Sequence, residues 1–288
     1  MCYIKGDTAN TQEQETGNIM EKVKPEDLKL VNLHTHCQFC GHSNGMPADF
    51  CAEVSGRINC IGFSDHGPYP DDFAFGDRMK YAMMPEYSAA LDAAQEQYKD
   101  MNILRGLEIE WRKELGKDFY QEYREKFRLD YFAGSAHYTE MGDKRLHFAG
   151  FTPDKKSIRS FVDTTLAMIE SEVYDFIAHP DAFMNKQATT DSELESWFNE
   201  IFCAAKQYNI PLEVNANGIR GKRCYPCRRF WELAGAYGGI RVIVNSDAHY
   251  LGQVYDDAMA DVVNLALETG NTPCNNEVAA GILKKRRS

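Results

Sequence analysis

Histidine and acidic residues recur in closely spaced pairs along this chain. His34 and His36 are separated by one residue, and Asp247 and His249 have the same spacing. Residues i and i+2 of an extended segment point to the same side, so each pair directs two polar side chains toward one point. Imidazole nitrogens and carboxylate oxygens together suit zinc, iron or manganese ions. One pair alone is weak evidence, because a histidine is more often a satisfied structural residue than a metal ligand.

The positions of the other histidines strengthen the metal interpretation. Short apolar runs predict seven β-strands, at Leu30–His36, Cys60–Ser64, Ile103–Ile109, Tyr131–Ala136, Asp175–Ala178, Pro211–Asn215 and Arg241–Ser246. Seven of the eight histidines lie at the end of such a run or in the loop after it, namely His34, His36, His42, His66, His137, His179 and His249. The carboxyl ends of parallel strands open onto one face of an α/β barrel, where active sites lie. Purely structural histidines would each need separate hydrogen-bond partners on that one rim, which we consider the weaker interpretation.

The number of candidate ligands predicts how many metal ions the site holds. Glu108, Glu110 and Asp247 add carboxylates to the seven histidines. A single catalytic zinc takes three protein ligands and a dinuclear site five or six, so this set overfills either. We therefore expect three metal ions. Glu108 and Glu110 point to the same side of their strand, and periodicity does not choose between them.

The elements that position these residues alternate between strands and helices. Helical patterns cover Pro85–Tyr98, Ser157–Glu172, Asp191–Tyr208 and Asp256–Thr269. Repeated βα units predict a parallel sheet, either a barrel or an open doubly wound sheet. We favour the barrel, because no Gly-x-Gly-x-x-Gly element marks a nucleotide site. We expect a polar tail over residues 1–29, with Met20 as a plausible alternative start, and a single domain over residues 30–288.

Composition excludes several classes of function. The net charge is −11, and the basic residues form no stripe that could follow a nucleic-acid backbone. No apolar run approaches the length of about 18 residues that a membrane helix needs, and no basic-then-apolar leader opens the chain, so we expect a cytoplasmic protein. Nine cysteines, an odd number, do not suggest a disulfide scaffold. Cys37 with Cys40, and Cys224 with Cys227, could form a zinc or redox site, but we favour free thiols.

Seven ordered motifs resemble those of the polymerase-and-histidinol-phosphatase (PHP) superfamily. They are His34-Thr35-His36, then His42, Ser64-Asp65-His66-Gly67, Gly106-Leu107-Glu108, Gly134-Ser135-Ala136-His137, Ala178-His179-Pro180-Asp181 and Ser246-Asp247-Ala248-His249. The resemblance spans residues 31 to about 250. It implies an α/β fold, a distorted (β/α)7 barrel resembling the TIM barrel, with a trinuclear centre of Zn²⁺, Mn²⁺ or Fe²⁺ at the carboxyl ends of the strands.

The resemblance also assigns the ligands. It implies one metal held by His34, His36, Glu108 and Asp247, a second by Glu108, His137 and His179, and a third by His42, His66 and His249. The Gly-Leu-Glu motif selects Glu108 as the bridging ligand and leaves Glu110 outside the first ring of ligands.

A further element resembles the histidinol-phosphatase branch of the superfamily. Glu213-x-Asn215-x-x-Gly218-x-Arg220 is followed by Tyr225-Pro226. The branch implies hydrolysis of L-histidinol phosphate, a small phosphorylated metabolite, with Arg220 as a phosphate clamp. Lys222 and Arg223 extend the positive charge of this loop, although short charge runs are usually solvated.

The resemblance predicts three catalytic residues, and it leaves rival functions open. These residues are Asp247, His137 and Asp65, and Asp65 would either donate a proton or hydrogen-bond a ligand imidazole. The alternatives are a phosphatase for another phosphate monoester or diester, a metal-site barrel without turnover, and a two-metal hydrolase, which would not need His42. The sequence predicts no oligomeric state.

Overall fold

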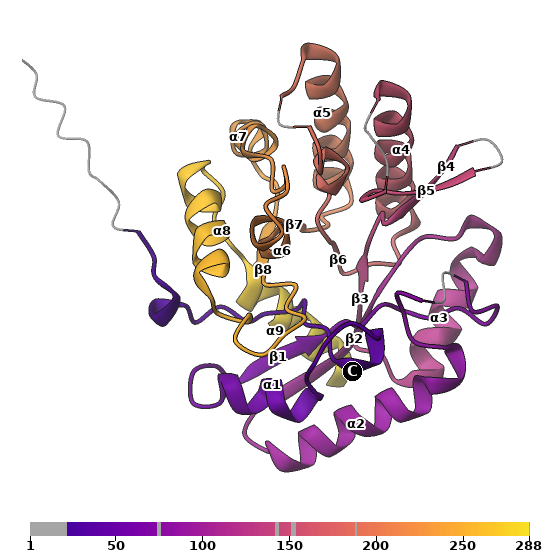
Figure 1. Ribbon diagram of the computed structural model, residues 1–288, viewed down its shortest axis with the longest axis vertical. Helices are drawn as coiled ribbons and strands as arrows, with labels where there is room; N and C mark the ends of the chain where they lie inside the picture. The colour runs from indigo at the N-terminus through magenta and orange to yellow at the C-terminus, as the bar shows by residue number, and fades with distance from the viewer. Residues whose placement is uncertain (1–21, 74–75, 142–143, 151–153, 188, 288) are drawn as a thin grey trace, which may run out of the picture.

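A curled sheet of parallel strands forms the centre of the structure (Figure 1). The structure, a computed structural model, describes residues 22–73, 76–141, 144–150, 154–187 and 189–287. Within these residues the sheet has six strands in the order β1-β2-β3-β6-β7-β8. Their bounds are Cys60–Phe63 (β1), Asn102–Ile109 (β2), Tyr131–Gly134 (β3), Phe176–Ile177 (β6), Leu212–Asn215 (β7) and Val242–Asn245 (β8). Six of the seven predicted strands are thus confirmed, each within two residues of its expected bounds.

The prediction of a first strand at Leu30–His36 is wrong in its detail. This segment forms only isolated parallel bridges, from Asn32 to Ile61 of β1 and from Thr35 to Ala248 beyond β8. It therefore lies between the two edge strands of the sheet and completes the distorted barrel without a regular ladder.

Asparagine side chains replace the missing ladder between this segment and β8. The Leu33 amide donates to Asn245 Oδ1 at 2.9 Å, and the Ser246 amide donates to Asn32 Oδ1 at 2.8 Å. Side-chain amides satisfy the buried backbone here, so the chain need not keep strand geometry.

Helices surround the outer face of the sheet (Figure 1). The described helices are α1 (Pro47–Val54), α2 (Met84–Gln97), α3 (Gly116–Phe127), α4 (Lys155–Ser171), α5 (Ser192–Gln207), α6 (Ala216–Arg220), α7 (Arg228–Tyr237), α8 (Asp257–Glu268) and α9 (Asn275–Arg287). The four helices that periodicity predicted correspond to α2, α4, α5 and α8. Asp154, Asp191 and Asp256 accept a backbone hydrogen bond at the start of the last three of these, which fixes where they begin.

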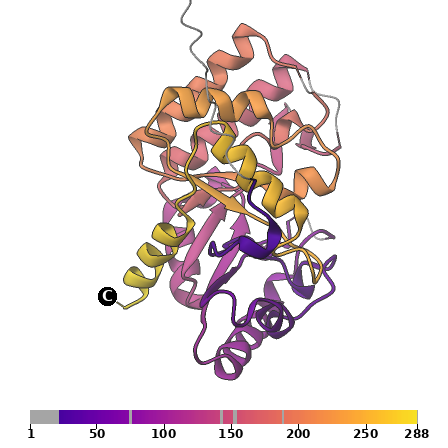
Figure 2. The ribbon, with the colours of Figure 1, turned by 90° about the vertical axis from the view of Figure 1, so that its left-hand side faces the viewer.

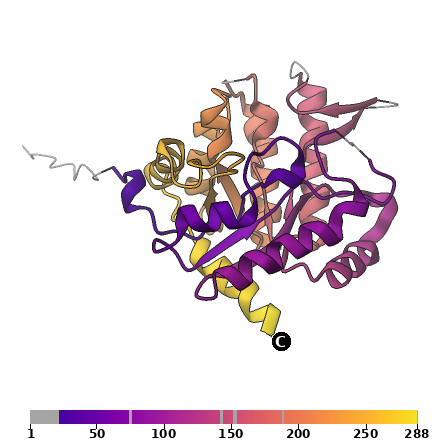
Figure 3. The ribbon, with the colours of Figure 1, turned by 60° about the horizontal axis from the view of Figure 1, so that its bottom comes forward.

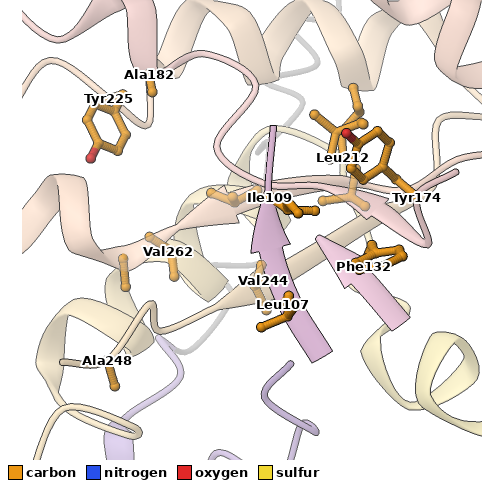
Figure 4. Close-up of a cluster of buried hydrophobic side chains, with 14 of the residues drawn as sticks. Leu107, Ile109, Phe132, Tyr174, Ala182, Leu212, Tyr225, Val244, Ala248 and Val262 are labelled. Carbon is orange, nitrogen blue, oxygen red and sulfur yellow. The ribbon is translucent and has the colours of Figure 1, made fainter. Parts of the chain in front are cut away.

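The two faces of β2 show how the sheet separates its core from its site. Leu107 and Ile109 point outward into the apolar layer beneath the helices, with Phe132 of β3 among their neighbours (Figure 4). Leu104 and Glu108 lie on the opposite, inner face, with Leu104 packed in a small inner cluster and Glu108 nearer the carboxyl end of the strand.

The amino end of the sheet is closed by α9. Its residues Val278, Ala279 and Ile282 pack against the inner cluster around Leu104 and Tyr131. Figure 3 shows α9, in yellow, beneath the sheet, and Figure 2 shows it from the side. The opposite, carboxyl end is therefore the end available for a site.

One buried tyrosine fills the middle of the barrel. The Tyr131 hydroxyl donates to the carbonyls of Leu33 at 2.7 Å and Phe63 at 3.0 Å. Its ring occupies the space where Gly106 has no side chain, since a Cβ at 106 would lie 2.2 Å from Tyr131 Cζ. Glycine at this position allows β2 to approach the tyrosine.

The structure adds a hairpin and an anchored segment that were not predicted. Strands β4 (Tyr138–Met141) and β5 (Lys144–His147) form an antiparallel pair after β3. Residues 1–21, most of the predicted tail and Met20 with it, lie outside the described residues. Beyond them the chain is held, because Val23 and the Asn264 side chain of α8 exchange two hydrogen bonds of 2.9 Å. No helix of the described residues is long and apolar enough to cross a membrane.

Candidate metal centre

The structure brings all of the predicted metal ligands to the carboxyl end of the sheet. Glu108 lies at their centre, with Oε1 2.8 Å from His179 Nε2 and 3.2 Å from His137 Nε2. Its other oxygen, Oε2, lies 2.9 Å from His66 Nδ1 and 3.5 Å from the Nε2 atoms of both His34 and His36. Five predicted histidine ligands from four separate segments thus converge on one carboxylate.

The remaining ligands complete the cluster on one side. Asp247 Oδ1 lies 3.2 Å from His36 Nε2. The His249 ring stacks on His36 at 4.1 Å between ring centres and on His42 at 4.7 Å. His42 also stacks on His66 at 5.3 Å. His42 enters from the loop after the first segment and covers this side of the cluster.

Glu110 lies outside this ring of ligands. Its carboxylate accepts hydrogen bonds from both terminal nitrogens of Arg78 at 2.8 Å and lies 3.0 Å from His137 Nδ1. Glu108 and Glu110 share a face of the same strand, and a buried arginine that only the tertiary structure provides gives Glu110 its separate role.

Two buried carboxylates fix the orientation of ligand histidines. Glu213 Oε1 lies 2.8 Å from His34 Nδ1, and Glu110 holds the Nδ1 of His137 in the same way. A carboxylate only accepts hydrogen bonds, so each Nδ1 carries a proton and each Nε2 faces the cluster. Burial lowers the pKa values of His34 and His137, but the surrounding carboxylates outweigh it and raise them, to about 10 for His137, so a metal would have to displace a proton from each Nε2. This arrangement is typical of histidines that bind a metal through Nε2.

Burial keeps other imidazoles uncharged. It lowers the pKa values of His36, His66 and His249 to about 3. These rings are therefore neutral at physiological pH and offer lone pairs, as metal ligands require.

The carboxylates of the cluster are ionised. Burial opposes ionisation of Glu108, but His137 and His34 outweigh it and hold its pKa well below the ordinary value. Burial also opposes ionisation of Asp247, but nearby histidines, chiefly His34, outweigh it and hold its pKa well below the ordinary value. Asp247 Oδ1 is buried and has no hydrogen-bond partner among the described residues. Lone pairs of neutral imidazoles and ionised carboxylates that face one another at close range fit divalent cations between them.

Strained backbone accompanies two of these ligands. His179 and Asp247 have φ angles of 28° and 49°, in the left-handed region that residues with a Cβ rarely adopt. Such strain clusters at functional sites, where the surrounding structure holds the residue in place. It supports a functional role for the turns that follow β6 and β8.

The grouping of ligand atoms differs in part from the predicted partition. Within the described residues, atoms of His34, His36 and Glu108 lie within 4.8 Å of one another, and these are three of the four ligands predicted for the first metal. Near the third, Cys40 groups with His42 and His249. The sequence interpretation treated Cys40 as a free thiol, and among the described cysteines it is indeed unpaired.

The structure gives Asp65 a different position from the predicted one. Its carboxylate accepts the backbone amides of Cys37 and Cys40 at 3.0 to 3.2 Å, and the Cys37 thiol donates to it at 2.9 Å. Burial raises its pKa to about 7. Asp65 therefore holds the turn between His36 and His42, and the prediction that it hydrogen-bonds a ligand imidazole is wrong.

The predicted phosphate clamp is also engaged elsewhere. The Arg220 guanidinium binds Asp256 through Nε and Nη2, and its terminal nitrogens donate to the carbonyls of Ser246 and Gln253. These contacts tie α6 to the loop after β8 and to the start of α8. They contradict the prediction that Arg220 is a phosphate clamp. Its guanidinium already donates to a carboxylate and two carbonyls, so few of its N–H groups remain for a phosphate.

Several residues that support the site had no assigned role in the sequence interpretation. Glu213 orients His34, while Asn215 and Asn217 donate to Asp247 Oδ2 at 3.1 and 3.2 Å. Glu213 and Asn215 are two residues apart on β7, so both side chains point toward the barrel interior. Polar residues at inward positions of a buried strand were the available signal.

Comparisons with known proteins agree with this picture. No family model matches the chain. A protein of Deinococcus radiodurans named "Probable histidinol-phosphatase" is 27% identical over 81% of this chain and 92% of its own length. One of Schizosaccharomyces pombe with the same name is 26% identical over 78% of this chain and 82% of its own length.

A solved structure shows the same fold. The histidinol phosphate phosphatase of Lactococcus lactis, complexed with zinc, L-histidinol and phosphate, superposes with a TM-score of 0.67 at 18% identity. The match covers 85% of this chain and 95% of that one. The chain therefore has the α/β fold of the PHP-type barrels. Its curated relatives support the resemblance to the histidinol-phosphatase branch.

Proposed function

We propose that this protein is a metal-dependent phosphomonoesterase that hydrolyses L-histidinol phosphate to L-histidinol and phosphate, a reaction of histidine biosynthesis. The observation that carries the proposal is the convergence of neutral or carboxylate-oriented imidazoles on Glu108 and Asp247. The names of the two curated relatives, and the ligands of the Lactococcus lactis structure, support this substrate.

The proposed cofactor is a trinuclear centre of divalent ions. Its ligands would be His34, His36, His42, His66, Glu108, His137, His179, Asp247 and His249. The zinc of the Lactococcus lactis structure supports zinc as one candidate, beside manganese and iron. The chemistry that such ions supply is neutralisation of the phosphate charge and acidification of water at neutral pH.

The protein's own residues would orient the reaction. Asn215 and Asn217 hold Asp247 by Oδ2, so that Oδ1 faces the cluster and can receive or deliver a proton at the reacting phosphate. Glu110 holds His137 by Nδ1, which directs Nε2 toward the cluster. Asp65 acts at a distance from the substrate, because it fixes the turn that carries His42.

The test is phosphate release from L-histidinol phosphate beside a generic aryl phosphate and a panel of other phosphorylated metabolites. The protein is assayed after its bound metals have been counted by elemental analysis. We expect about three metals per chain and a marked preference for histidinol phosphate. Preference for another ester would retain the phosphatase chemistry and refute the substrate, and metal-loaded protein without any phosphatase activity would refute both.

A further inference from the structure

One cation near the metal centre has no carboxylate partner among the described residues. Arg223 is exposed in the turn between α6 and α7, and its Nη1 donates a hydrogen bond to the Tyr225 hydroxyl at 2.8 Å. Three other arginines of the carboxyl end are each paired, Arg78 with Glu110, Arg112 with Asp71 and Arg220 with Asp256.

Aromatic rings connect Arg223 to two predicted ligands. Its Cζ lies 5.8 Å from the ring centre of Tyr225 and 5.9 Å from that of Phe148. The Tyr225 ring centre is 6.2 Å from that of His179, and the Phe148 ring centre is 6.0 Å from it. The Phe148 ring also stacks beside His137 at 5.9 Å. Arg223 thus lies on an aromatic wall, Phe148 and Tyr225, that borders the metal centre.

The local backbone favours the position of the Arg223 side chain against this aromatic wall. The Arg223 amide donates to the Gly218 carbonyl at 2.9 Å, which anchors the turn to α6. A Cβ at Gly221 would lie 2.9 Å from Arg223 Nε, so glycine at 221 leaves room for the guanidinium to fold back. The Tyr225 hydroxyl then holds one nitrogen and leaves the remaining N–H groups available.

We propose that Arg223, rather than Arg220, binds the phosphate group of the substrate at the rim of the metal centre. The proposal rests on the proposed function and deepens it, because it names the residue that recognises the dianion. A guanidinium with free N–H groups forms strong charge-assisted hydrogen bonds to phosphate oxygens. The aromatic wall limits the positions that its long side chain can take, so less conformational freedom is lost on binding.

The experiment measures the dissociation constant of inorganic phosphate for the metal-loaded protein by titration calorimetry. The variants are Arg223→Ala, Arg223→Lys and the control Lys222→Ala, which removes the same charge from the neighbouring exposed position. Loss of one charge-assisted contact predicts phosphate binding weaker by about tenfold or more in Arg223→Ala, and by less than about threefold in Lys222→Ala. Arg223→Lys should lie between them, because lysine keeps the charge without the planar fork. Metal content, counted for every variant, should equal that of the wild type.

The outcomes separate this proposal from the proposed function. Equal phosphate affinity in Arg223→Ala and Lys222→Ala would overturn the role of Arg223, whatever the enzyme hydrolyses. Absence of phosphate binding to the wild type would overturn it as well. If phosphate binding depends on Arg223 but histidinol phosphate is not hydrolysed, the anion site stands and the proposed substrate fails.

Discussion

Replacing Glu213 with glutamine tests how the buried polar network positions the metal centre. Glu213 is fully buried, and four donors converge on its carboxylate. Oε1 accepts from His34 Nδ1 and Asn245 Nδ2, both at 2.8 Å. Oε2 accepts from the His179 amide at 3.0 Å and Asn215 Nδ2 at 2.8 Å. Glutamine keeps the shape but turns one acceptor oxygen into an NH2 donor.

Each orientation of the new amide has a cost. An NH2 group toward Asn215 leaves two buried donors without acceptors, at about 1–3 kcal/mol each, or about 2–6 kcal/mol in total. An NH2 group toward His34 favours the tautomer in which His34 Nε2 carries the proton, and that nitrogen then has no lone pair for a metal. Loss of such an outer partner lowers metal affinity by about 10- to 100-fold.

The assay combines urea unfolding of the metal-free protein with zinc affinity measured by competition against a chromophoric chelator. Glu277→Gln is the matched control, because this exposed carboxylate pairs with Arg241 on the surface and should contribute less than about 1 kcal/mol. If the free energy of unfolding of Glu213→Gln lies within about 0.5 kcal/mol of the wild-type value, and its zinc dissociation constant within about twofold, the reasoning about this network is wrong.

Three further perturbations give distinct results. Asp247→Asn should lower kcat for phosphate release by about 100-fold or more and reduce bound metal, which kinetics and elemental analysis measure together; normal turnover with full metal content would contradict its role. Burial opposes ionisation of Glu110, but Arg78 outweighs it and holds the pKa well below the ordinary 4.5, so this carboxylate stabilises the fold above pH 4.5. The unfolding free energies of wild type and Glu110→Gln, both metal-free, should therefore differ most near pH 7 and converge as the pH falls below 4.5; a constant difference would oppose this view. Gly106→Ala places a Cβ 2.2 Å from Tyr131 Cζ and should destabilise the protein by about 3 kcal/mol in thermal unfolding, whereas alanine at the open surface position Gly281 should have little effect.

The local sequence pattern was sufficient to predict most of the strands of the sheet and four of the helices. Alternating apolar runs and helical periodicity located six strands and four helices, because a strand buried in a parallel sheet and an amphipathic helix both leave a pattern in adjacent residues. The same logic failed at Leu30–His36, where distant asparagines such as Asn245 and Asn275 satisfy the backbone. Hydrogen bonds between residues more than 200 positions apart leave no local pattern.

The residue types that face the site were also encoded locally. Strand ends carry the histidines, and parallel strands bring their carboxyl ends to one side, so the sequence determined the composition of the cluster and its place in the fold. The sequence did not determine the partners of each polar group. Arg220 ends α6 and Arg223 lies in the turn directly after it, with equal charge, and only the tertiary structure pairs the first with Asp256 and leaves the second beside Tyr225.

There is a physical reason why the sequence determines some features of this protein and the tertiary structure determines others. Secondary structure and the direction of side chains depend on neighbours within a few residues, which the sequence lists in order. Roles such as those of Glu108 at the centre, Glu110 with Arg78, and Asp65 at the Cys37 turn depend on which charged or polar groups meet after folding. The sequence by itself thus determined most of the elements and the metal-binding character of this protein, and the tertiary structure decided which polar groups pair, which orient a neighbour and which remain without a carboxylate partner.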